Sequence, residues 1–403
     1  MVKIGIIREG KVPSDSRVAF SPVQCAWLMN HFPTISIFAQ PSSERCYTDK
    51  EYEDQGIVIR ENLEDCDILF GIKEVPPRQL IPGKTYLFFS HTRKKQSYNQ
   101  PLFREIIDRK VTLIDYECFQ YENNQRILGF GYFAGIVGAH NGLMAYGKRT
   151  GLFELGRAYQ QGSYKNILAM YNNLPLPEMK IAVTGSGRVA SGVLELMRVL
   201  KIKHVNPSDY QSQKFNEPVF TQLKGGDLYK PMGGNEFIRE DFFENASDYR
   251  CEFYPYTKNT DLLINGIYWD EKIPRLFECD DLNDNDFRIQ TIADITDDKY
   301  GSVPCNLGDS TIEDPVYGID RNTHKKTAPY LPGSVDVMAV GNLPNELPRE
   351  ASEHFGNQLI KYIFEDLISE GSPVIDRATM VKAGNITSRF EYLTDYAEGI
   401  FTL

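Results

Sequence analysis

Short apolar segments alternate with amphipathic stretches over about the first 130 residues, and this alternation predicts strands connected by helices. The helix candidates include residues 22–31 and 101–109. Strands are predicted at residues 3–7, 35–38, 57–59, 68–71, 85–89 and 112–114. Because strands that alternate with helices form mostly parallel sheets with both faces covered, the pattern predicts an α/β fold.

Gly and Ala are dense between residues 131 and 146, in a stretch predicted to be a long connecting helix that continues to Leu155. Small residues allow a neighbouring helix or a ligand to approach the backbone closely. The sequence leaves both explanations open, because small residues serve close packing as readily as binding.

A second group of elements begins after a proline-punctuated linker at residues 174–179. A polar stretch with Gly and Pro, residues 207–260, interrupts this group. Near the C-terminal end, apolar residues at helical spacing predict a helix over residues 350–369. Strands are predicted at residues 180–184, 262–267 and 291–295.

A glycine-rich turn follows the predicted strand 180–184 and precedes an amphipathic helix. The turn consists of Gly185, Ser186, Gly187, Arg188, Val189 and Ala190. In such a turn the first glycine permits the sharp bend, the second lets the backbone approach a pyrophosphate, and a small third residue permits close helix–strand packing. The helix N-terminus offers free N–H groups to the phosphates. The strand–turn–helix context therefore predicts a binding site for NAD or NADP.

An acidic residue about 20 positions after the first glycine commonly binds the ribose hydroxyls in such sites. Asp209 follows the second predicted strand and is the candidate for that role. However, Pro207-Ser208-Asp209 is also typical of a solvated turn. The choice between NAD and NADP therefore stays open.

Length and composition are those of a folded protein without an expected nucleic-acid or membrane partner, and a small-molecule partner is predicted from the motifs instead. The chain has 403 residues, which favours two domains, and a net charge of −11. Nucleic acid is not an expected partner, because the basic residues are scattered rather than clustered. No run of about 18 apolar residues predicts a membrane span. The first residues resemble a strand rather than a signal peptide, so a cytoplasmic protein is expected. The seven cysteines form no CxxC pair, and no metal site is predicted.

Three polar side chains follow predicted strands in the first part of the chain: Arg17, Lys73 and His91. Ligands gather at the carboxyl ends of strands in open α/β sheets. A lysine and a histidine there can exchange protons, and an arginine can bind a carboxylate. Each also has an ordinary explanation, since Arg and Lys near loops are usually solvated and a histidine can be purely structural.

Seven segments spread along nearly the whole chain carry a resemblance to a known family. They are residues 70–76 (FGIKEVP), 88–92 (FFSHT), 113–117 (LIDYE), 129–135 (GFGYFAG), 263–269 (LINGIYW), 293–298 (ADITDD) and 347–352 (LPREAS). In order and rough spacing they resemble the alanine dehydrogenase superfamily. The resemblance is closer to its lysine-linked branch, which comprises saccharopine dehydrogenase (L-lysine-forming) and the lysine–ketoglutarate reductase domain.

The resemblance implies two Rossmann-like, doubly wound α/β domains with an active-site cleft between them. It implies a discontinuous substrate domain formed by residues 1–135 and 345–403. Residues 136–344 would form the dinucleotide-binding domain. The oligomeric state stays open.

The resemblance also implies roles for individual residues. Lys73 and His91 match acid–base residues, and Arg17 matches a ligand of a substrate carboxylate. Further substrate-site positions are Lys94, Glu117 and Arg126. Besides the glycine turn and Asp209, the positions implied to contact the cofactor are Asn265, Gly266, Ile267, Asp294 and Leu343.

The implied reaction joins the ε-amine of lysine to the ketone of 2-oxoglutarate through an imine, which NAD(P)H reduces to saccharopine. Gly341 departs from the lysine-forming enzymes, which carry an acidic residue there, and is nearer the alanine dehydrogenases. Val189 and Gly266 stand where some relatives have a cysteine pair, so no disulfide is expected there. Two alternatives stay open: an alanine- or opine-type dehydrogenase using another keto acid, and a catalytically silent nucleotide-binding regulator.

Overall fold

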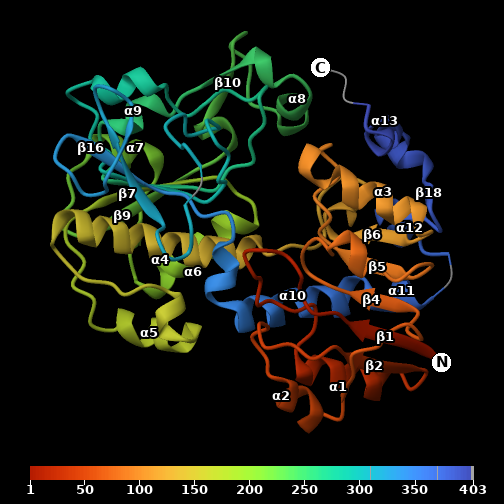
Figure 1. The fold of residues 1–403 in the computed structure, drawn as a ribbon. Coiled ribbons are helices and arrows are strands. Elements are labelled where there is room, and N and C mark those ends of the chain that lie inside the picture. Colours follow the sequence, from red (N-terminus) through yellow and green to blue (C-terminus); the bar gives the residue numbers. More distant parts are fainter. Residues whose placement is uncertain (309, 370, 401–403) are drawn as a thin grey trace. The chain divides into compact units, whose positions relative to one another are not determined.

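The computed structural model describes residues 1–308, 310–369 and 371–400. The chain divides into two compact units, each built around an eight-stranded sheet. Unit 1 comprises Met1–Phe130 and Pro348–Leu403, and unit 2 comprises Gly131–Leu347. In Figure 1 the first part of the chain, in red and orange, shares its unit with the last part, in blue.

The sheet of unit 1 has the strand order β18-β17-β6-β5-β4-β1-β2-β3. The first six strands of the chain are mutually parallel, and the last two add to the β6 edge in antiparallel fashion. This order of the parallel strands is the doubly wound arrangement, with its switch point between β1 and β4. The strands are β1 (Val2–Ile6), β2 (Ile35–Ala39), β3 (Val58–Ile59), β4 (Ile68–Phe70), β5 (Thr85–Phe88), β6 (Thr112–Asp115), β17 (Thr379–Lys382) and β18 (Asn385–Ile386).

The helices of unit 1 come from both ends of the chain. The single helix expected over residues 350–369 is two helices, because the backbone leaves helical geometry at Ile363 (φ −130°). Ser21 begins the first helix with a reciprocal capping box to Gln24, which satisfies two otherwise unpaired groups. The helices are α1 (Pro22–His31), α2 (Asp49–Asp54), α3 (Gln100–Asp108), α10 (Pro348–Tyr362), α11 (Phe364–Ile368), α12 (Pro373–Ala378) and α13 (Thr394–Glu398).

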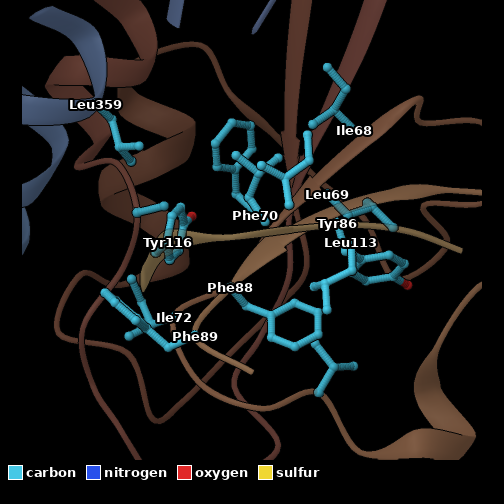
Figure 2. Packing of buried hydrophobic residues seen from close by; sticks show 14 of the residues in the cluster. Ile68, Leu69, Phe70, Ile72, Tyr86, Phe88, Phe89, Leu113, Tyr116 and Leu359 are labelled. Atoms are coloured by element: carbon cyan, nitrogen blue, oxygen red, sulfur yellow. The ribbon is translucent and has the colours of Figure 1, made fainter. Parts of the chain in front are cut away.

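The core of unit 1 joins the central strands to the returning C-terminal segment. Side chains of β4, β5 and β6 form one buried cluster with Leu359 of α10 (Figure 2). The Phe355 ring of the same helix stacks on Phe130 at 4.4 Å and lies edge-on to Tyr116 at 5.0 Å. Burial of large side chains such as these stabilises a fold by roughly 1.5–3 kcal/mol each. The C-terminal segment is therefore part of this core.

The sheet of unit 2 has the order β15-β14-β16-β13-β12-β7-β9-β8. The six neighbouring strands from β16 to β8 are mutually parallel. Strand β14 runs antiparallel to β16, and β15 runs antiparallel to β14. The stretch 207–260, expected to interrupt the domain, contributes the inner strand β9. The strands are β7 (Lys180–Thr184), β8 (Lys203–His204), β9 (Val219–Leu223), β12 (Leu262–Asn265), β13 (Thr291–Asp294), β14 (Val316–Asp320), β15 (Lys326–Thr327) and β16 (Ser334–Met338), with a separate pair β10 (Tyr229–Pro231) and β11 (Tyr249–Cys251).

The long helix α4 (Gly131–Thr150) packs against α6 (Arg188–Val199) and against the sheet of unit 2 (Figure 1). A Cβ added at Gly135 would lie 2.0 Å from the Val189 carbonyl oxygen, and one at Gly192 would lie 2.0 Å from the Tyr132 carbonyl oxygen. Only glycine permits these approaches, so close helix packing accounts for the small residues here. The helix ends at Thr150, before Leu155. The other helices of unit 2 are α5 (Tyr164–Tyr171), α7 (Pro207–Ser212), α8 (Arg239–Glu244) and α9 (Tyr254–Thr257).

Helical membrane spans and clusters of metal ligands are both absent from the part of the chain that the structure describes. None of its helices combines the length and the apolar character that crossing a membrane requires. Within the same residues, no group of three or more His, Cys, Asp or Glu side chains is placed to hold a metal ion. The cysteines, all of which lie in described positions, are free thiols.

Candidate functional site

Unit 1 carries a cluster of ionisable side chains where three neighbouring strands end. Glu9 follows β1, Lys73 and Glu74 follow β4, and His91 follows β5. Because β1, β4 and β5 are adjacent and parallel, their carboxyl ends lie at one edge of the sheet. This edge, beside the switch point, is where doubly wound folds bind ligands.

Glu9 fixes the backbone that presents Lys73. Its carboxylate accepts the N–H of Ile72 at 2.7 Å and the N–H of Lys73 at 2.8 Å. Burial raises the pKa of Glu9 to about 8, although these two hydrogen bonds act in the opposite direction. Glu9 therefore holds the loop after β4 in place and is itself able to exchange a proton near neutral pH.

The Lys73 amine is the strongest candidate for proton transfer in unit 1. Burial, followed by repulsion from the Arg17 guanidinium, lowers the pKa of Lys73 to about 8 from the ordinary 10.5, although Asp15 acts to raise it. An amine with this pKa is present in both its neutral and its charged form at moderately alkaline pH. It can therefore accept and return a proton during a reaction.

His91 is oriented by Glu74. Its backbone has φ 50°, and its Nδ1 lies 2.7 Å from the Glu74 carboxylate. Although burial opposes ionisation, His91 and Lys11 hold the pKa of Glu74 well below its usual range. Since an ionised carboxylate only accepts hydrogen bonds, Nδ1 must carry the shared proton, which leaves Nε2 to exchange a proton with a ligand.

Arg17 lies beside this cluster, with its guanidinium held by Asp15. Nε donates to one Asp15 oxygen at 2.9 Å and Nη2 donates to the other at 2.6 Å, and both side chains are buried. The guanidinium also lies 4.2 Å from the centre of the Phe130 ring. Although burial opposes it, the Arg17 charge holds the pKa of Asp15 well below its usual range. Asp15 thus fixes the orientation of the arginine that was predicted to bind a carboxylate.

The three other predicted substrate-site residues occupy less central positions. Glu117 lies just beyond the end of β6, and its carboxylate accepts a hydrogen bond from Arg126 Nη2 at 2.7 Å. Despite burial, Arg126 and His91 keep the pKa of Glu117 lowered. Lys94 is exposed in the turn that follows His91. The structure thus places Glu117 and Arg126 together beside the cluster, and Lys94 at its surface.

Four members of this cluster were not predicted from the sequence: Glu9, Lys11, Asp15 and Glu74. Glu9 and Glu74 lie a few residues beyond the ends of β1 and β4. The rule that ligands gather at strand ends would therefore have included them. Their pairing with particular cations depends on how the loops fold over the sheet edge. That path is not visible in the spacing of the residues.

In unit 2 the glycine turn combines a positive φ angle with close backbone contacts. Gly185 has φ +100°, and its N–H donates to the Leu223 carbonyl at 2.9 Å. A Cβ at Gly185 would lie 2.7 Å from the Gly266 carbonyl oxygen. Gly187 begins the three-turn helix α6, and a Cβ there would meet no atom within 4 Å. The open backbone at Gly187 and the N-terminus of α6 would suit a pyrophosphate.

The remaining predicted residues of the turn differ in their exposure to solvent. Ser186 is exposed, and Arg188 and Val189 are half-buried on the first turn of α6. A Cβ at Gly266 would lie 2.8 Å from Val189 Cγ1, so these two positions are neighbours. Ile267 follows Gly266 and is buried.

A buried polar network holds the ends of β7, β12 and β13 together. Thr184 Oγ1 donates to the Asn265 side-chain oxygen at 2.6 Å, and Asn265 Nδ2 donates to Asp294 at 2.8 Å. Asn306 also donates to Asp294 at 2.8 Å. Burial raises the pKa of Asp294, whose side chain has no exposed surface. Asn265 and Asp294 therefore shape the strand ends, and their side chains point into the network.

Leu343 and Asp209 are the two remaining residues that were predicted to contact the cofactor. The Leu343 side chain is buried against α4, where a Cβ at Gly138 would lie 3.2 Å from it. Asp209 lies in the first turn of α7, and its carboxylate accepts hydrogen bonds from Asn206 and Gln213, each at 2.7 Å.

The helix that carries Asp209 is attached to the opposite end of the sheet. Lys180, the first residue of β7, donates through Nζ to the carbonyls of Tyr210 and Gln213. Tyr210 also bonds Thr260, which precedes β12. The glycine turn follows the last residue of β7, roughly 13 Å further along at about 3.3 Å per residue. The structure therefore does not bring Asp209 to the glycine turn.

Comparisons with known proteins agree with this architecture. The family model described as "Alanine dehydrogenase/PNT, N-terminal domain" matches residues 5–137. An α-aminoadipic semialdehyde synthase of Arabidopsis thaliana is 28% identical over 439 residues, covering 97% of this chain and 41% of the relative. The mitochondrial enzyme of that name from Mus musculus is 29% identical, covering 90% of this chain and 44% of the relative. The chain thus spans about four tenths of the length of these relatives.

Relatives of matching length and solved structures complete the comparison. The NAD(+)-dependent, L-lysine-forming saccharopine dehydrogenase of Yarrowia lipolytica is 23% identical, covering 94% of this chain and 95% of the relative. An L-alanine dehydrogenase structure has a TM-score of 0.66 at 15% identity, covering 99% of this chain and all of that chain. A transhydrogenase from Sinorhizobium meliloti has a TM-score of 0.59 at 12% identity, with 95% and 98% covered. The two structures confirm the fold. By its sequence relatives, the chain is similar to the saccharopine dehydrogenase branch of the alanine dehydrogenase superfamily.

Proposed function

We propose that this protein is an NAD(P)-dependent dehydrogenase acting on CH–NH groups, and that it interconverts saccharopine with L-lysine and 2-oxoglutarate. The observation that carries the proposal is the Lys73 amine with its lowered pKa, in one cluster with the Glu74-oriented His91. The glycine turn of unit 2 supports dinucleotide binding, and the names of the sequence relatives support the substrate pair.

The proton transfers of this reaction match the groups in unit 1. When the lysine ε-amine adds to the ketone of 2-oxoglutarate, the amine nitrogen loses a proton and the former ketone oxygen gains one. Loss of that oxygen as water, after it takes up a second proton, gives the protonated imine, which is the form that a hydride reduces. A neutral amine at Lys73 accepts the first proton, and His91, through Nε2, delivers a proton to the departing oxygen. Oxidation of saccharopine uses the same transfers in reverse.

Binding of the substrates requires positive charge, because both carry carboxylates. The Arg17 guanidinium is fixed by Asp15, so it offers its charge in a constant orientation. When bound in unit 2, NAD(P)H supplies the hydride that reduces the imine carbon. The residues that would hold its pyrophosphate are Gly185, Ser186, Gly187 and the first N–H groups of α6.

The proposal is tested by following NAD(P)H absorbance with lysine and 2-oxoglutarate. Lys73→Met and His91→Gln are each expected to lower turnover by about 100-fold or more, while dinucleotide binding measured by fluorescence is unchanged. Lys50→Met, which removes an exposed lysine of α2 paired with Asp54, is the matched control and retains full turnover. Near-normal turnover of either test variant would contradict the assigned roles.

A second substrate class has one observation in its favour. The resemblance places Gly341 where lysine-forming enzymes carry an acidic residue and makes it nearer the alanine dehydrogenases. This difference favours an alanine- or opine-type amino-acid dehydrogenase that acts on another keto acid. Turnover with ammonia and pyruvate, but not with lysine and 2-oxoglutarate, would establish that class. Dinucleotide binding without turnover on either pair would indicate a regulator.

A further inference from the structure

We propose that strand β9 selects the dinucleotide and that Lys224, the residue after this strand, binds the 2′-phosphate of NADP(H). The inference deepens the proposed function, since it concerns the cofactor of the same dinucleotide site. It starts from the order of the strands in unit 2, where β9 and not β8 lies next to the glycine-turn strand β7.

The register of these strands brings the end of β9 against the glycine turn. Thr184 pairs with Leu223, the last residue of β9. The Leu223 carbonyl accepts the N–H of Gly185 at 2.9 Å, and the Gln222 side chain donates to the Gly185 carbonyl at 2.8 Å. Neighbouring strands lie about 4.8 Å apart, so the backbone of Lys224 is adjacent to the first glycine.

This is the position at which dinucleotide-binding folds distinguish the two cofactors. The residue at the carboxyl end of the strand beside the glycine strand lies next to the adenosine ribose. An acidic side chain there accepts hydrogen bonds from the 2′- and 3′-hydroxyls of NAD, whereas a cation accommodates the 2′-phosphate of NADP. In this chain the position holds an exposed lysine, Lys224.

The second strand in sequence, β8, does not reach this site. It has two residues, and its last, His204, pairs with Phe220, three residues before the end of β9. After Val205, whose N–H donates to the Phe220 carbonyl, the chain enters α7, which is attached to the opposite end of the sheet at Lys180. An acidic residue borne by β8 or α7 is therefore not available to the ribose.

The acidic residue nearest to Lys224 along the chain is Asp227, which is the alternative candidate for contacting the ribose and would favour NAD. Its carboxylate accepts the backbone N–H of Lys224 at 3.3 Å and so faces back into the turn. Between them lie Gly225, with φ +50°, and Gly226, which add no side chains of their own. The lysine ammonium is thus the first charge beyond the strand end that can reach a ligand, and an ammonium is a good point charge for a phosphate.

The test uses binding rather than turnover. NADPH, NADH, 2′,5′-ADP and 5′-ADP are titrated into the full chain by calorimetry. The wild-type protein is expected to bind NADPH and 2′,5′-ADP about tenfold or more tightly than NADH and 5′-ADP. Lys224→Gln is expected to remove this preference while NADH affinity is unchanged. Lys203→Gln, an exposed lysine on β8 paired with Glu217, is the matched control and keeps the preference.

Three outcomes overturn the proposal. These are an unchanged NADPH preference in Lys224→Gln, a wild-type preference for NADH that Asp227→Asn abolishes, and no binding of either dinucleotide. Because these titrations contain no amine or keto acid, their outcome does not depend on whether the proposed lysine-linked reaction is correct. A protein that keeps the Lys224-dependent preference yet turns over another amine and keto acid would refute only the substrate assignment.

Discussion

The lowered pKa of Lys73 can be measured directly, without reference to catalysis. Burial and the Arg17 charge bring this pKa from 10.5 to about 8. Each pKa unit changes the ratio of neutral to charged amine tenfold, so the shift raises that ratio by roughly 300-fold at any pH below 8. Lys73 should therefore react with an acylating reagent at a pH where ordinary lysine amines are almost wholly protonated.

Competitive labelling with acetic anhydride between pH 6 and about 11 provides the assay, because the reagent reacts only with neutral amines and reference lysines titrate near 10.4. The peptide that carries Lys73 is quantified by mass spectrometry against N-acetyl-lysine amide in the same tube. Limited access of the reagent lowers the amount of label but does not move its midpoint. We expect a midpoint near pH 8 for Lys73. A midpoint near 10 would refute the argument that burial and Arg17 depress this pKa.

The same titration sets the expected direction of the pH–rate profile. If neutral Lys73 is the base in saccharopine oxidation, kcat/KM rises with pH and levels off above about 8. This limb should be absent from the residual activity of Lys73→Met. A limb at the same pH in that variant would assign the ionisation to another group, of which Glu9 is the first to consider because burial raises its pKa to about 8.

Two further predictions concern stability. Gly135→Ala places a Cβ 2.0 Å from the Val189 carbonyl oxygen and should lower the free energy of unfolding by about 2 kcal/mol. Gly187→Ala, whose Cβ would meet no atom within 4 Å, should leave the melting temperature unchanged while weakening dinucleotide binding. Equal melting temperatures in both variants would contradict the packing argument. Glu9 has a folded-state pKa raised to about 8, so its contribution is fully present below pH 4.5 and is lost as pH rises through 8, by about 1.4 kcal/mol per unit. Urea unfolding between pH 5 and 8.5 should show a smaller decline in Glu9→Gln, and an undiminished decline would refute the raised pKa.

Where the hydrophobic pattern is regular, the sequence predicted the structure well. The strand 180–184 and the helix 22–31 have the bounds that were expected, and the α/β fold is confirmed. Their signals are local, because a run of buried residues or a capping box needs no information from distant parts of the chain. The break at Ile363 was not predicted, since the apolar spacing continues through it.

The candidate site of unit 1 was predicted in part for a related reason. Lys73 and His91 were found because they follow clear strands and match a family segment. Their carboxylate partners were missed, because Glu9 reaches Lys73 across 64 positions of the chain and Glu74 reaches His91 across 17. These pairings are set by the neighbour order β1-β4-β5, which the sequence does not state. Yet they determine the orientation of His91 and the backbone position of Lys73.

Asp209 lies away from the glycine turn for the same reason, because the order of strands in the sequence differs from their order in the sheet. A count of residues from the first glycine assumes that the next strand along the chain is also the next strand in the sheet. Here β8 has two residues, Lys203 and His204, and both are exposed, so it buries too little to occupy an inner position. Strand β9 buries four of its five residues and takes the place beside β7. The apolar residues of β9 are visible in the sequence. Comparing the apolar content of β8 and β9, instead of counting residues from the first glycine, therefore identifies Lys224 as the residue beside the ribose.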